Sequence, residues 1–375
     1  MIYFDNAATT FKKPLSVKLS TLIALQKYSA NPGRSGHKLS LKTAEKIFET
    51  RVRVADFFNC TKIENVIFTK NCTEAINLVI LGSVKEKGNV IASCFEHNSV
   101  LRPLKQLENE NKISLTIVSP QNKRNITLED IKKEVKSNTY LICVNHISNV
   151  TGNKNDIENI GKYCKENNIL FLVDAAQSAG HEKINIEKQN INFLCFAGHK
   201  GLFAPQGIGG LCINTEKFPK PLSFGGTGTN SKELTQPKTL PEYYESGTLS
   251  TPLIIGLNSG IKYVDKNFNK IKNKTKRLTE KLYEELSKLE NITIYTDKKS
   301  NSGVISFNIK NRTSSDVANT LDEKFNIAVR SGLHCAPLAH EFLGTTNQGS
   351  VRTSLNHFNS FGEIKKFIKA IKTLI

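Results

Sequence analysis

A lysine follows a histidine in the stretch Cys-Phe-Ala-Gly-His-Lys-Gly-Leu-Phe-Ala, residues 195–204, where an apolar run breaks into a glycine-rich turn. This residue, Lys200, comes 26 residues after Asp174, which closes another apolar run and begins the segment Asp-Ala-Ala-Gln-Ser, residues 174–178. A pyridoxal phosphate site requires an amine that forms a Schiff base and a carboxylate that keeps the pyridinium nitrogen protonated. Taken alone, Lys200 would be interpreted as a surface loop residue, because the chain holds 52 lysines and arginines.

The residues around Lys200 favour a binding site over a surface loop. Seven apolar, β-branched runs occupy residues 65–69, 89–94, 114–119, 140–145, 169–174, 191–197 and 209–214. Most are separated by stretches compatible with helices, and this alternation predicts an α/β fold with a largely parallel, buried sheet. Open sheets of this kind bind ligands beyond the carboxyl ends of their strands. Polar residues follow those ends here, namely His97, Asn149, Asp174, Gln177 and Lys200.

The C-terminal third has a different pattern. Apolar residues recur at helical spacing over residues 262–288 with lysines on the other face, which predicts a long helix with a solvated side. Short strands are expected at 292–295, 304–309, 327–330 and 351–355, with helices near 315–325 and 362–374. These elements predict a smaller α+β domain.

Eight short segments, taken together and in order, resemble the class V aminotransferase family of fold-type I pyridoxal phosphate enzymes, and within it the cysteine desulfurases. They are Tyr-Phe-Asp-Asn-Ala-Ala-Thr-Thr (3–10), Asn-Pro-Gly-Arg-Ser-Gly-His (31–37), Thr-Lys-Asn-Cys-Thr-Glu-Ala-Ile-Asn (69–77), Glu-His-Asn-Ser (96–99), Asp-Ala-Ala-Gln (174–177), Gly-His-Lys (198–200), Arg-Ser-Gly-Leu-His-Cys (330–335) and Val-Arg-Thr-Ser-Leu (351–355). The resemblance implies a large cofactor-binding domain with a mostly parallel seven-stranded sheet, residues 15–255. A small domain, residues 1–14 and 256–375, would carry the catalytic cysteine loop.

The resemblance assigns roles around the cofactor. His97 stacks on the pyridine ring and exchanges protons with the substrate nitrogen, Asp174 holds the ring nitrogen, and Gln177 donates to the phenolic oxygen. Lys200 needs a lowered pKa to act as nucleophile and base. Asn149 is also expected at the cofactor. A Thr251 contributed by a second subunit would reach the phosphate, which implies a homodimer.

A phosphate cup is expected where the run ending at Thr69 turns into a helix near Thr73. Free amides and the helix dipole would point at an anion in front of Thr73. The alternative is that Thr73 is an ordinary helix N-cap. The resemblance adds Cys72 and His199 as phosphate neighbours.

Cys335 is the second expected chemical centre. It lies in a loop-like stretch with Gly332 before it and Pro337 after it, so we expect an exposed or mobile thiol. The resemblance implies that its thiolate attacks the sulfur of L-cysteine, leaving L-alanine and an enzyme persulfide. The other seven cysteines, by position, are predicted to be structural. Substrate binding is assigned to Arg352, whose planar fork suits a carboxylate, and to Asn6, Ala8 and Arg330.

The short segment between Cys335 and Arg352 resembles the SufS-like, group II desulfurases, whose compact loop suggests a dedicated sulfur-acceptor protein. Three positions depart from the pattern of these enzymes. Ala197 stands where a phosphate-binding serine is common, Cys72 where threonine is common, and Leu333 where histidine is frequent. The first two remove hydroxyl groups from the phosphate cup, and the third bears on substrate preference.

Composition sets further expectations. The chain has 375 residues and a formal net charge of +18. Part of the excess lies on the predicted helix 262–288 as a solvated face, and no nucleic-acid motif accompanies it, so we expect no nucleic-acid partner. No apolar run could span a bilayer, residues 1–10 lack a leader pattern, and eight cysteines form no CxxC pair, which together predict a cytoplasmic protein without a membrane partner. Histidine spacing predicts no metal.

Three alternatives to a cysteine desulfurase stay open from the sequence. A selenocysteine lyase would use the same residues on L-selenocysteine and would need Cys335 less. An aminotransferase or epimerase of the same fold would keep Lys200 without using Cys335. A cofactor-binding or nucleic-acid-binding protein without turnover would keep the fold and the charge.

Overall fold

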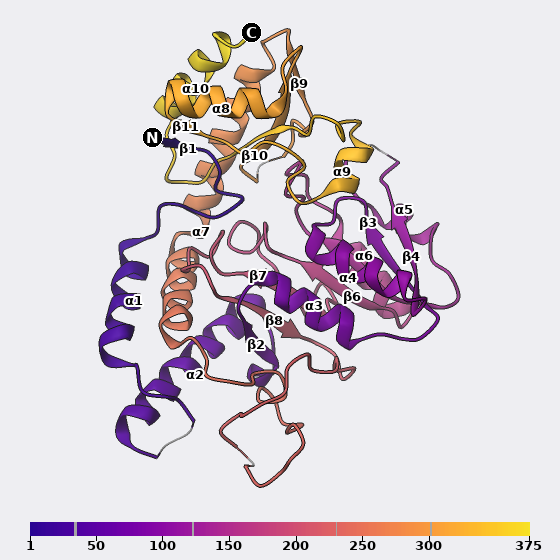
Figure 1. Ribbon diagram of the computed structural model, residues 1–375, viewed down its shortest axis with the longest axis vertical. Coiled ribbons are helices and arrows are strands. Elements are labelled where there is room, and N and C mark those ends of the chain that lie inside the picture. The colour runs from indigo at the N-terminus through magenta and orange to yellow at the C-terminus, as the bar shows by residue number, and fades with distance from the viewer. Residues whose placement is uncertain (34–35, 122–123, 230, 301) are drawn as a thin grey trace.

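The computed structural model describes residues 1–33, 36–121, 124–229, 231–300 and 302–375. Its centre is a seven-stranded sheet in the order β2-β8-β7-β6-β5-β3-β4 (Figure 1). The strands are β2 (Val66–Thr69), β3 (Gly88–Ser93), β4 (Ile113–Val118), β5 (Thr139–Asn145), β6 (Leu170–Asp174), β7 (Phe193–Ala197) and β8 (Gly209–Ile213). All seven predicted runs are strands. The sheet is parallel except for β8, which runs antiparallel to both β7 and β2.

Alternate residues of the strands face two separate cores, as the period of two in a strand requires. One core joins residues such as Phe171, Val173 and Phe196 to the apolar sides of α2 (Lys38–Phe58), α6 (Ile157–Glu166) and the first part of α7 (Thr251–Leu286). The other joins Leu172 and Cys195 to α3 (Cys72–Gly82) and α4 (Asn98–Asn109). Because both faces are covered, the strand ends are the open edge of the sheet.

The remaining elements of the large sheet region are short or peripheral. They are α1 (Leu15–Lys27), the 3-10 turn η1 (Ile63–Asn65) and α5 (Leu128–Lys132). Between β6 and β7, and between β7 and β8, the chain makes turns and no helix. The turn after β7 carries Lys200.

A second, smaller sheet has the antiparallel order β12-β10-β9. Its strands are β9 (Ile292–Ile294), β10 (Val304–Ile309) and β12 (Val351–Ser354), and its helices are α8 (Ser314–Phe325), α9 (Pro337–Phe342) and α10 (Phe361–Lys372). The expected strand at 327–330 is shorter, because β11 (Ile327–Ala328) has only β1 (Ile2–Tyr3) as a partner and pairs with it in parallel. The N-terminus therefore lies against this C-terminal unit.

Helix α7 connects the two units. It begins at Thr251, eleven residues before the expected start, and its first half packs on the large sheet while Leu278, Leu282 and Leu286 enter the core of the small unit. Its lysines are on the other face, as predicted, and several pair with glutamates of the same helix. We propose residues 15–255 and residues 1–14 with 256–375 as the two domains, so that α7 crosses their boundary.

Candidate active site

A cavity of about 230 Å³ lies at the carboxyl ends of the parallel strands. It collects most of the residues that the sequence predicted for the site. Those residues are Cys72, Thr73, His97, Asn149, Asp174, Gln177, His199, Lys200, Arg330, Arg352 and Ala8. The ends of β5, β6 and β7 and the starts of α3 and α4 supply most of them, while Ala8, Arg330 and Arg352 come from the N-terminal segment and the small sheet unit. The extremes are more than 300 residues apart along the chain.

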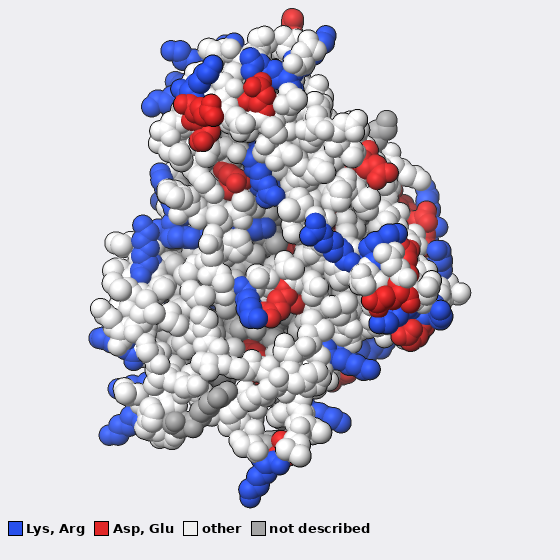
Figure 2. All heavy atoms as spheres, viewed as in Figure 1, with Lys and Arg blue, Asp and Glu red and all other residues white. Residues whose placement is uncertain are grey.

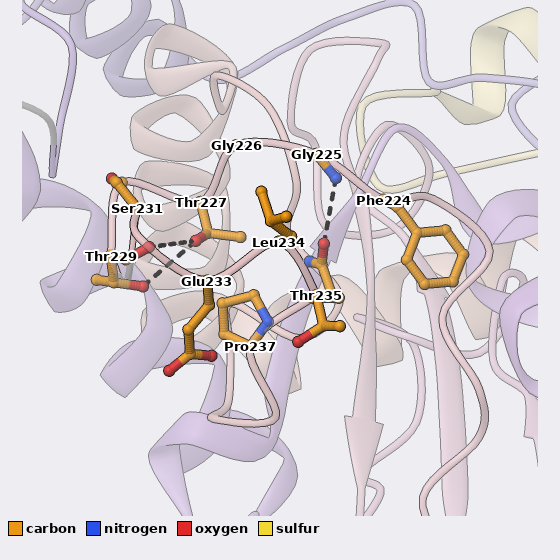
Figure 3. A pocket seen from close by; sticks show the side chains of 12 residues that line it. Phe224, Gly225, Gly226, Thr227, Thr229, Ser231, Glu233, Leu234, Thr235 and Pro237 are labelled. Carbon is orange, nitrogen blue, oxygen red and sulfur yellow. Dashed lines mark hydrogen bonds between the residues drawn. The ribbon is translucent and has the colours of Figure 1, made fainter.

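A larger hollow of about 830 Å³ is lined by loop residues on both sides of position 230, from Phe224 to Thr229 and from Ser231 to Pro237 (Figure 3). Its lining consists of loop residues such as Thr227, Thr229 and Leu234, and Glu233 is the only ionisable residue among the described residues that line it. It therefore offers no combination of amine and carboxylate, and the smaller cavity is the candidate active site.

Lys200 is half-buried in the turn that follows β7. Burial lowers the pKa of its amine, with the cations Arg352 and Arg330 acting in the same direction, while Asp174 and Cys72 oppose the shift. The lowered pKa gives a larger fraction of neutral amine at neutral pH, which is the nucleophilic form.

Asp174 ends β6 with its carboxylate at the cavity. One oxygen, Oδ1, accepts hydrogen bonds from the amide of Ala176 (2.8 Å) and from the thiol of Cys72 (3.5 Å). The other oxygen accepts no hydrogen bond from the described residues. A carboxylate held at one oxygen and open at the other suits a protonated ring nitrogen.

His97 is the N-cap of α4. Its Nδ1 accepts from the amide of Ser99 (3.0 Å) and lies 2.9 Å from the Ser99 hydroxyl. Burial lowers the pKa of His97 to about 4, against a smaller opposite effect of Asp174. The imidazole is therefore neutral near pH 7, and Nε2 is the nitrogen left to exchange a proton with a ligand.

The start of α3 forms an anion cradle, but Thr73 is not its N-cap. Asn71 is the cap, accepting from the amide of Glu74 (2.9 Å), because its side chain reaches the third helical residue and Thr73 is already inside the helix. Within the described residues, the amides of Cys72 and Thr73 have no acceptor. A Cβ on Gly209 would lie 2.8 Å from the Cys72 amide nitrogen, so only glycine keeps this approach open.

His199 closes the cradle from the lysine turn. Its Nδ1 lies 3.0 Å from the Thr9 hydroxyl, and burial lowers its pKa to about 4, with Lys200 and Lys13 adding to the shift. These groups fit a pyridoxal phosphate. The two free amides and the neutral imidazole of His199 suit its phosphate, the amine of Lys200 suits its aldehyde, and the open oxygen of Asp174 suits its protonated ring nitrogen.

Arg352 lies on β12 and is 1% exposed. Its Nη2 pairs with Asp5 Oδ1 (2.9 Å), and its Nη1 donates to the backbone oxygen of Asn149 (3.0 Å). Nε is buried without a partner. The guanidinium therefore lines the cavity in an orientation fixed by two contacts. Its remaining N–H groups are available to bind a substrate carboxylate.

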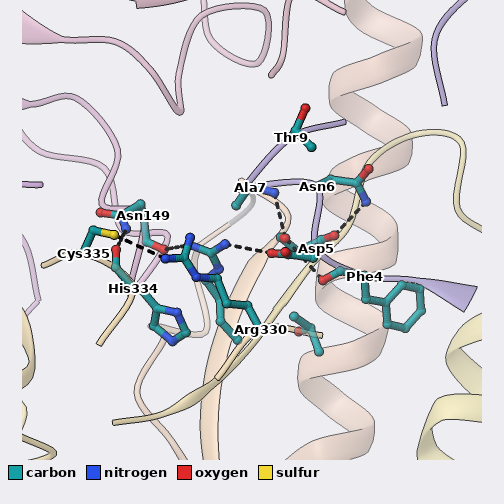
Figure 4. A network of polar contacts seen from close by, with 12 residues as sticks. Phe4, Asp5, Asn6, Ala7, Thr9, Asn149, Arg330, His334 and Cys335 are labelled. Carbon is teal, nitrogen blue, oxygen red and sulfur yellow. Dashed lines mark hydrogen bonds and ion pairs between the residues drawn. The ribbon is translucent and has the colours of Figure 1, made fainter. Parts of the chain in front are cut away.

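Cys335 belongs to a loop that is anchored, where the sequence suggested a mobile or exposed one. Its carbonyl accepts from the amide of Asn98 (2.7 Å), next to His97, and Asn149 Nδ2 donates to the carbonyl of His334 (2.7 Å). Its half-buried thiol lies 3.3 Å from Arg330 Nη2 (Figure 4). His334 and Cys335 both have positive φ, 50° and 58°, a conformation that non-glycine residues seldom adopt.

Three predicted residues do not line the cavity, namely Asn6, Thr251 and Cys335. The Asn6 side chain is occupied by Ser354, Asn356 and Asn359 and does not line the cavity (Figure 4). Thr251 is buried at the start of α7, also outside the lining. Gln177 lines the cavity, and its Nε2 donates to the backbone oxygen of Ala7 (2.9 Å). Arg34 and Ser35 of segment 31–37 lie outside the described residues.

Sequence reasoning missed several residues of the site. Asp5 pairs with Arg352 although it lies 347 positions away, and only its place in the segment 3–10 could have indicated it. Asn145, at the end of β5, was equally available from the strand-end rule. Glu96, buried beneath the site, accepts from the Asn145 amide (2.7 Å), and burial raises its pKa to about 8.

Seven histidines that are buried or half-buried predict strong acid sensitivity. Burial lowers their pKa values to about 2 (His334), about 3 (His146) and about 4 (His97, His181, His199, His340 and His357). An unfolded chain binds these protons below about pH 6.5 and the folded chain only near pH 4 or lower. Each histidine therefore removes up to about 1.4 kcal/mol of unfolding free energy per pH unit between these values. The raised pKa of Glu96 has the opposite effect on the pH dependence of unfolding free energy, and it offsets the contribution of one histidine.

Urea unfolding of the full chain at pH 7, 6 and 5 tests this expectation. The midpoint should fall steeply between pH 6 and 5, because the difference in bound protons is largest there. An unchanged midpoint over this range would contradict it.

Among the described residues, no group of three or more His, Cys, Asp or Glu side chains is arranged to hold a metal ion. In the same part of the chain, no helix is long and apolar enough to cross a membrane. On the face drawn in Figure 2, lysine and arginine are scattered over the middle as well as the edges and are interspersed with acidic residues.

The whole chain is similar to known proteins. The family model described as aminotransferase class-V matches residues 2–367. Probable cysteine desulfurases of Pyrococcus abyssi and Borreliella burgdorferi are each 37% identical over all of this chain, covering 94% and 92% of those proteins. The solved apo structure of a cysteine desulfurase from Thermococcus onnurineus NA1 is 36% identical, with a TM-score of 0.92 over 100% of this chain and 94% of that one. The predicted α/β fold is confirmed.

Proposed function

The chain belongs to the class V aminotransferase family, and from this premise we propose that it is a pyridoxal-phosphate-dependent cysteine desulfurase. It converts L-cysteine to L-alanine and transfers the sulfur to Cys335 and then to an acceptor. The observation that carries the proposal is that the Cys335 loop lies next to the cavity that contains the amine of Lys200. The Cys335 loop is hydrogen-bonded beside His97, and Arg330, which contacts the Cys335 thiol, lines the same cavity as Lys200.

Pyridoxal phosphate, when bound, withdraws electrons from the substrate and so acidifies its α-proton and weakens the bond between the β-carbon and sulfur. Lys200 holds the cofactor and moves the α-proton, for which its lowered pKa suits it. Asp174 keeps the ring nitrogen protonated through its open oxygen. His97 is neutral and exchanges a proton at the substrate nitrogen.

Arg352 and Asn149 orient the substrate. The guanidinium is already fixed by Asp5 and by the Asn149 carbonyl, so little side-chain freedom is lost when a carboxylate binds to its remaining N–H groups. Arg330 stands between this carboxylate site and the Cys335 thiol. The substrate sulfur is thereby directed toward Cys335.

The sulfur transfer needs no oxidant or reductant beyond the substrate and these residues. The Cys335 thiolate attacks the substrate sulfur, a sulfur–sulfur bond forms and the bond to the β-carbon breaks. The electron pair of that broken bond stays on the substrate side, which takes up a proton and leaves as L-alanine. A second thiol then accepts the persulfide sulfur, and with dithiothreitol the product is sulfide.

The compact, anchored loop supports assignment to the group II, SufS-like desulfurases. A half-buried persulfide on Cys335 is shielded from small oxidants, so a dedicated acceptor protein would have to fetch the sulfur. The eight free cysteines support a reducing, cytoplasmic compartment.

A homodimer is supported by an apolar patch on α1 and α2. Leu15, Leu19, Leu22 and Leu25 of α1 are 68%, 49%, 52% and 58% exposed, and Phe48 of α2 is 57% exposed. Patches of this kind mark protein interfaces. Helix α1 packs along α7 (Figure 1), the helix that begins at Thr251, the residue expected to reach a second subunit's cofactor. Analytical ultracentrifugation of the holoenzyme should show a dimer.

The experiment that tests the proposed function is product analysis with the purified holoenzyme. L-cysteine and dithiothreitol should give sulfide and L-alanine in equal amounts. Release of L-alanine from L-selenocysteine but not from L-cysteine would replace the desulfurase assignment with a selenocysteine lyase. Transfer of the amino group to a 2-oxo acid, without sulfide, would indicate an aminotransferase.

A further inference from the structure

The N-terminal segment 5–13 runs between the small sheet and the Lys200 turn. On one side Asn6 and the amide of Ala7 are hydrogen-bonded to Ser354. On the other side, three residues contact the backbone or ring of His199, namely Thr9, Thr10 and Lys13. The segment therefore joins β12, which carries Arg352, to the turn that carries the Schiff-base lysine.

One carbonyl receives most of these contacts. The backbone oxygen of His199 accepts from the Thr10 amide (3.2 Å), the Thr10 hydroxyl (3.0 Å) and the Lys13 ammonium (2.8 Å). The Thr9 hydroxyl is a fourth, longer donor to the same oxygen (3.4 Å). A carbonyl oxygen has two lone pairs, so these donors saturate it. This oxygen belongs to the peptide group that joins His199 to Lys200.

Lys13 is the charged member of the group. Its ammonium also lies 2.6 Å from the Thr10 hydroxyl, and no carboxylate of the described residues pairs with it. Burial lowers its pKa to about 8. A buried ammonium is costly unless hydrogen bonds compensate it, and here its acceptors are the His199 carbonyl and Thr10.

We propose that Lys13 is a positioning residue that fixes the His199–Lys200 peptide, and with it the lysine amine and the His199 imidazole, against the cofactor cavity. The proposal rests on the proposed function, because it assumes pyridoxal phosphate at Lys200. Lys13 does not line the cavity and acts through the turn. Without it, the two donors from Thr10 would remain, but the strongest, charge-assisted one would be lost.

Cofactor retention by the full-length holoenzyme tests the proposal without relying on turnover. Lys13→Met should release pyridoxal phosphate about tenfold faster on dialysis, followed by the cofactor's visible absorbance, as expected for loss of one charge-assisted hydrogen bond. Lys13→Arg restores a charged donor and should stay within about threefold of the wild type. Lys12→Met, at the exposed neighbouring lysine, is the matched control and should not change release.

Each other outcome overturns the proposal. Equal release from Lys13→Met and wild type would show that the contact does not position the turn. Equal acceleration in Lys13→Met and Lys13→Arg, with the same fall in melting temperature, would assign Lys13 a merely structural role. A wild type that binds no pyridoxal phosphate would instead refute the proposed function, so the two failures are distinguishable.

Discussion

Replacing Cys335 with alanine is expected to lower sulfide release from L-cysteine by at least about a thousandfold, as is usual when a catalytic nucleophile is removed. The physical reason is that no other thiol can take its place. Cys72 lines the cavity, but it donates to Asp174, and its pKa is raised well above the usual range, chiefly by burial. It therefore supplies almost no thiolate at neutral pH.

The rest of the site should survive this substitution. Cys335→Ala keeps Lys200, Asp174 and Arg352, so L-cysteine should still bind and change the cofactor's visible absorbance. Cys94→Ala is the matched control, since Cys94 lies three residues from His97 but is buried, with a pKa raised to about 12. Sulfide release that persisted in Cys335→Ala would contradict the persulfide route, and a loss in both variants would indicate damage to folding.

Replacing Lys200 with alanine is expected to remove both desulfuration and stable cofactor binding, with turnover at least about a thousandfold lower. The amine has two tasks, because it anchors the cofactor and moves the α-proton of the substrate. No other lysine lines the cavity among its described residues. The measurement is alanine formation together with the amount of pyridoxal phosphate that copurifies.

The Lys200→Arg variant tests whether the positive charge of Lys200 is sufficient or whether its neutral amine is required. Arginine keeps a positive charge near Asp174 but stays protonated and cannot act as nucleophile or base at neutral pH. It should be as inactive as Lys200→Ala. Partial recovery of Lys200→Ala by a small primary amine would support the proton-transfer role. Substantial activity in Lys200→Arg would disprove the assignment of Lys200.

The three departures from the group II pattern acquire a physical meaning in the structure. Ala197 lines the cavity without a hydroxyl, so the anion cradle relies on the amides of Cys72 and Thr73 and on His199. Cys72 directs its thiol to Asp174. Leu333 is 37% exposed in the cysteine loop, where an imidazole would add a polar group. The cofactor's phosphate is thus expected to be held by backbone groups more than by hydroxyls.

Local patterns were sufficient for the sheet and for the residues at its edge. All seven apolar runs became strands, and for six of them burial on both faces requires continuous apolar sequence, which is visible without any tertiary information. The edge strand β4 is partly exposed. The strand-end rule then located His97, Asp174 and Lys200, since the carboxyl ends of parallel strands meet at one edge. The resemblance supplied their chemical roles and pointed to Cys335 and Arg352.

The sequence by itself thus determined the α/β sheet and the family, and it supplied the lysine and the thiol that we propose as reactive groups. Only the tertiary structure decided how distant segments meet: Asp5 with Arg352, Asn98 with the Cys335 loop, and Lys13 with the His199 carbonyl. It also placed Asn71, not Thr73, as the cap of α3 and directed Asn6 away from the cavity. Periodicity reports which face of an element is buried, whereas a hydrogen bond between residues hundreds of positions apart depends on the packing of whole elements.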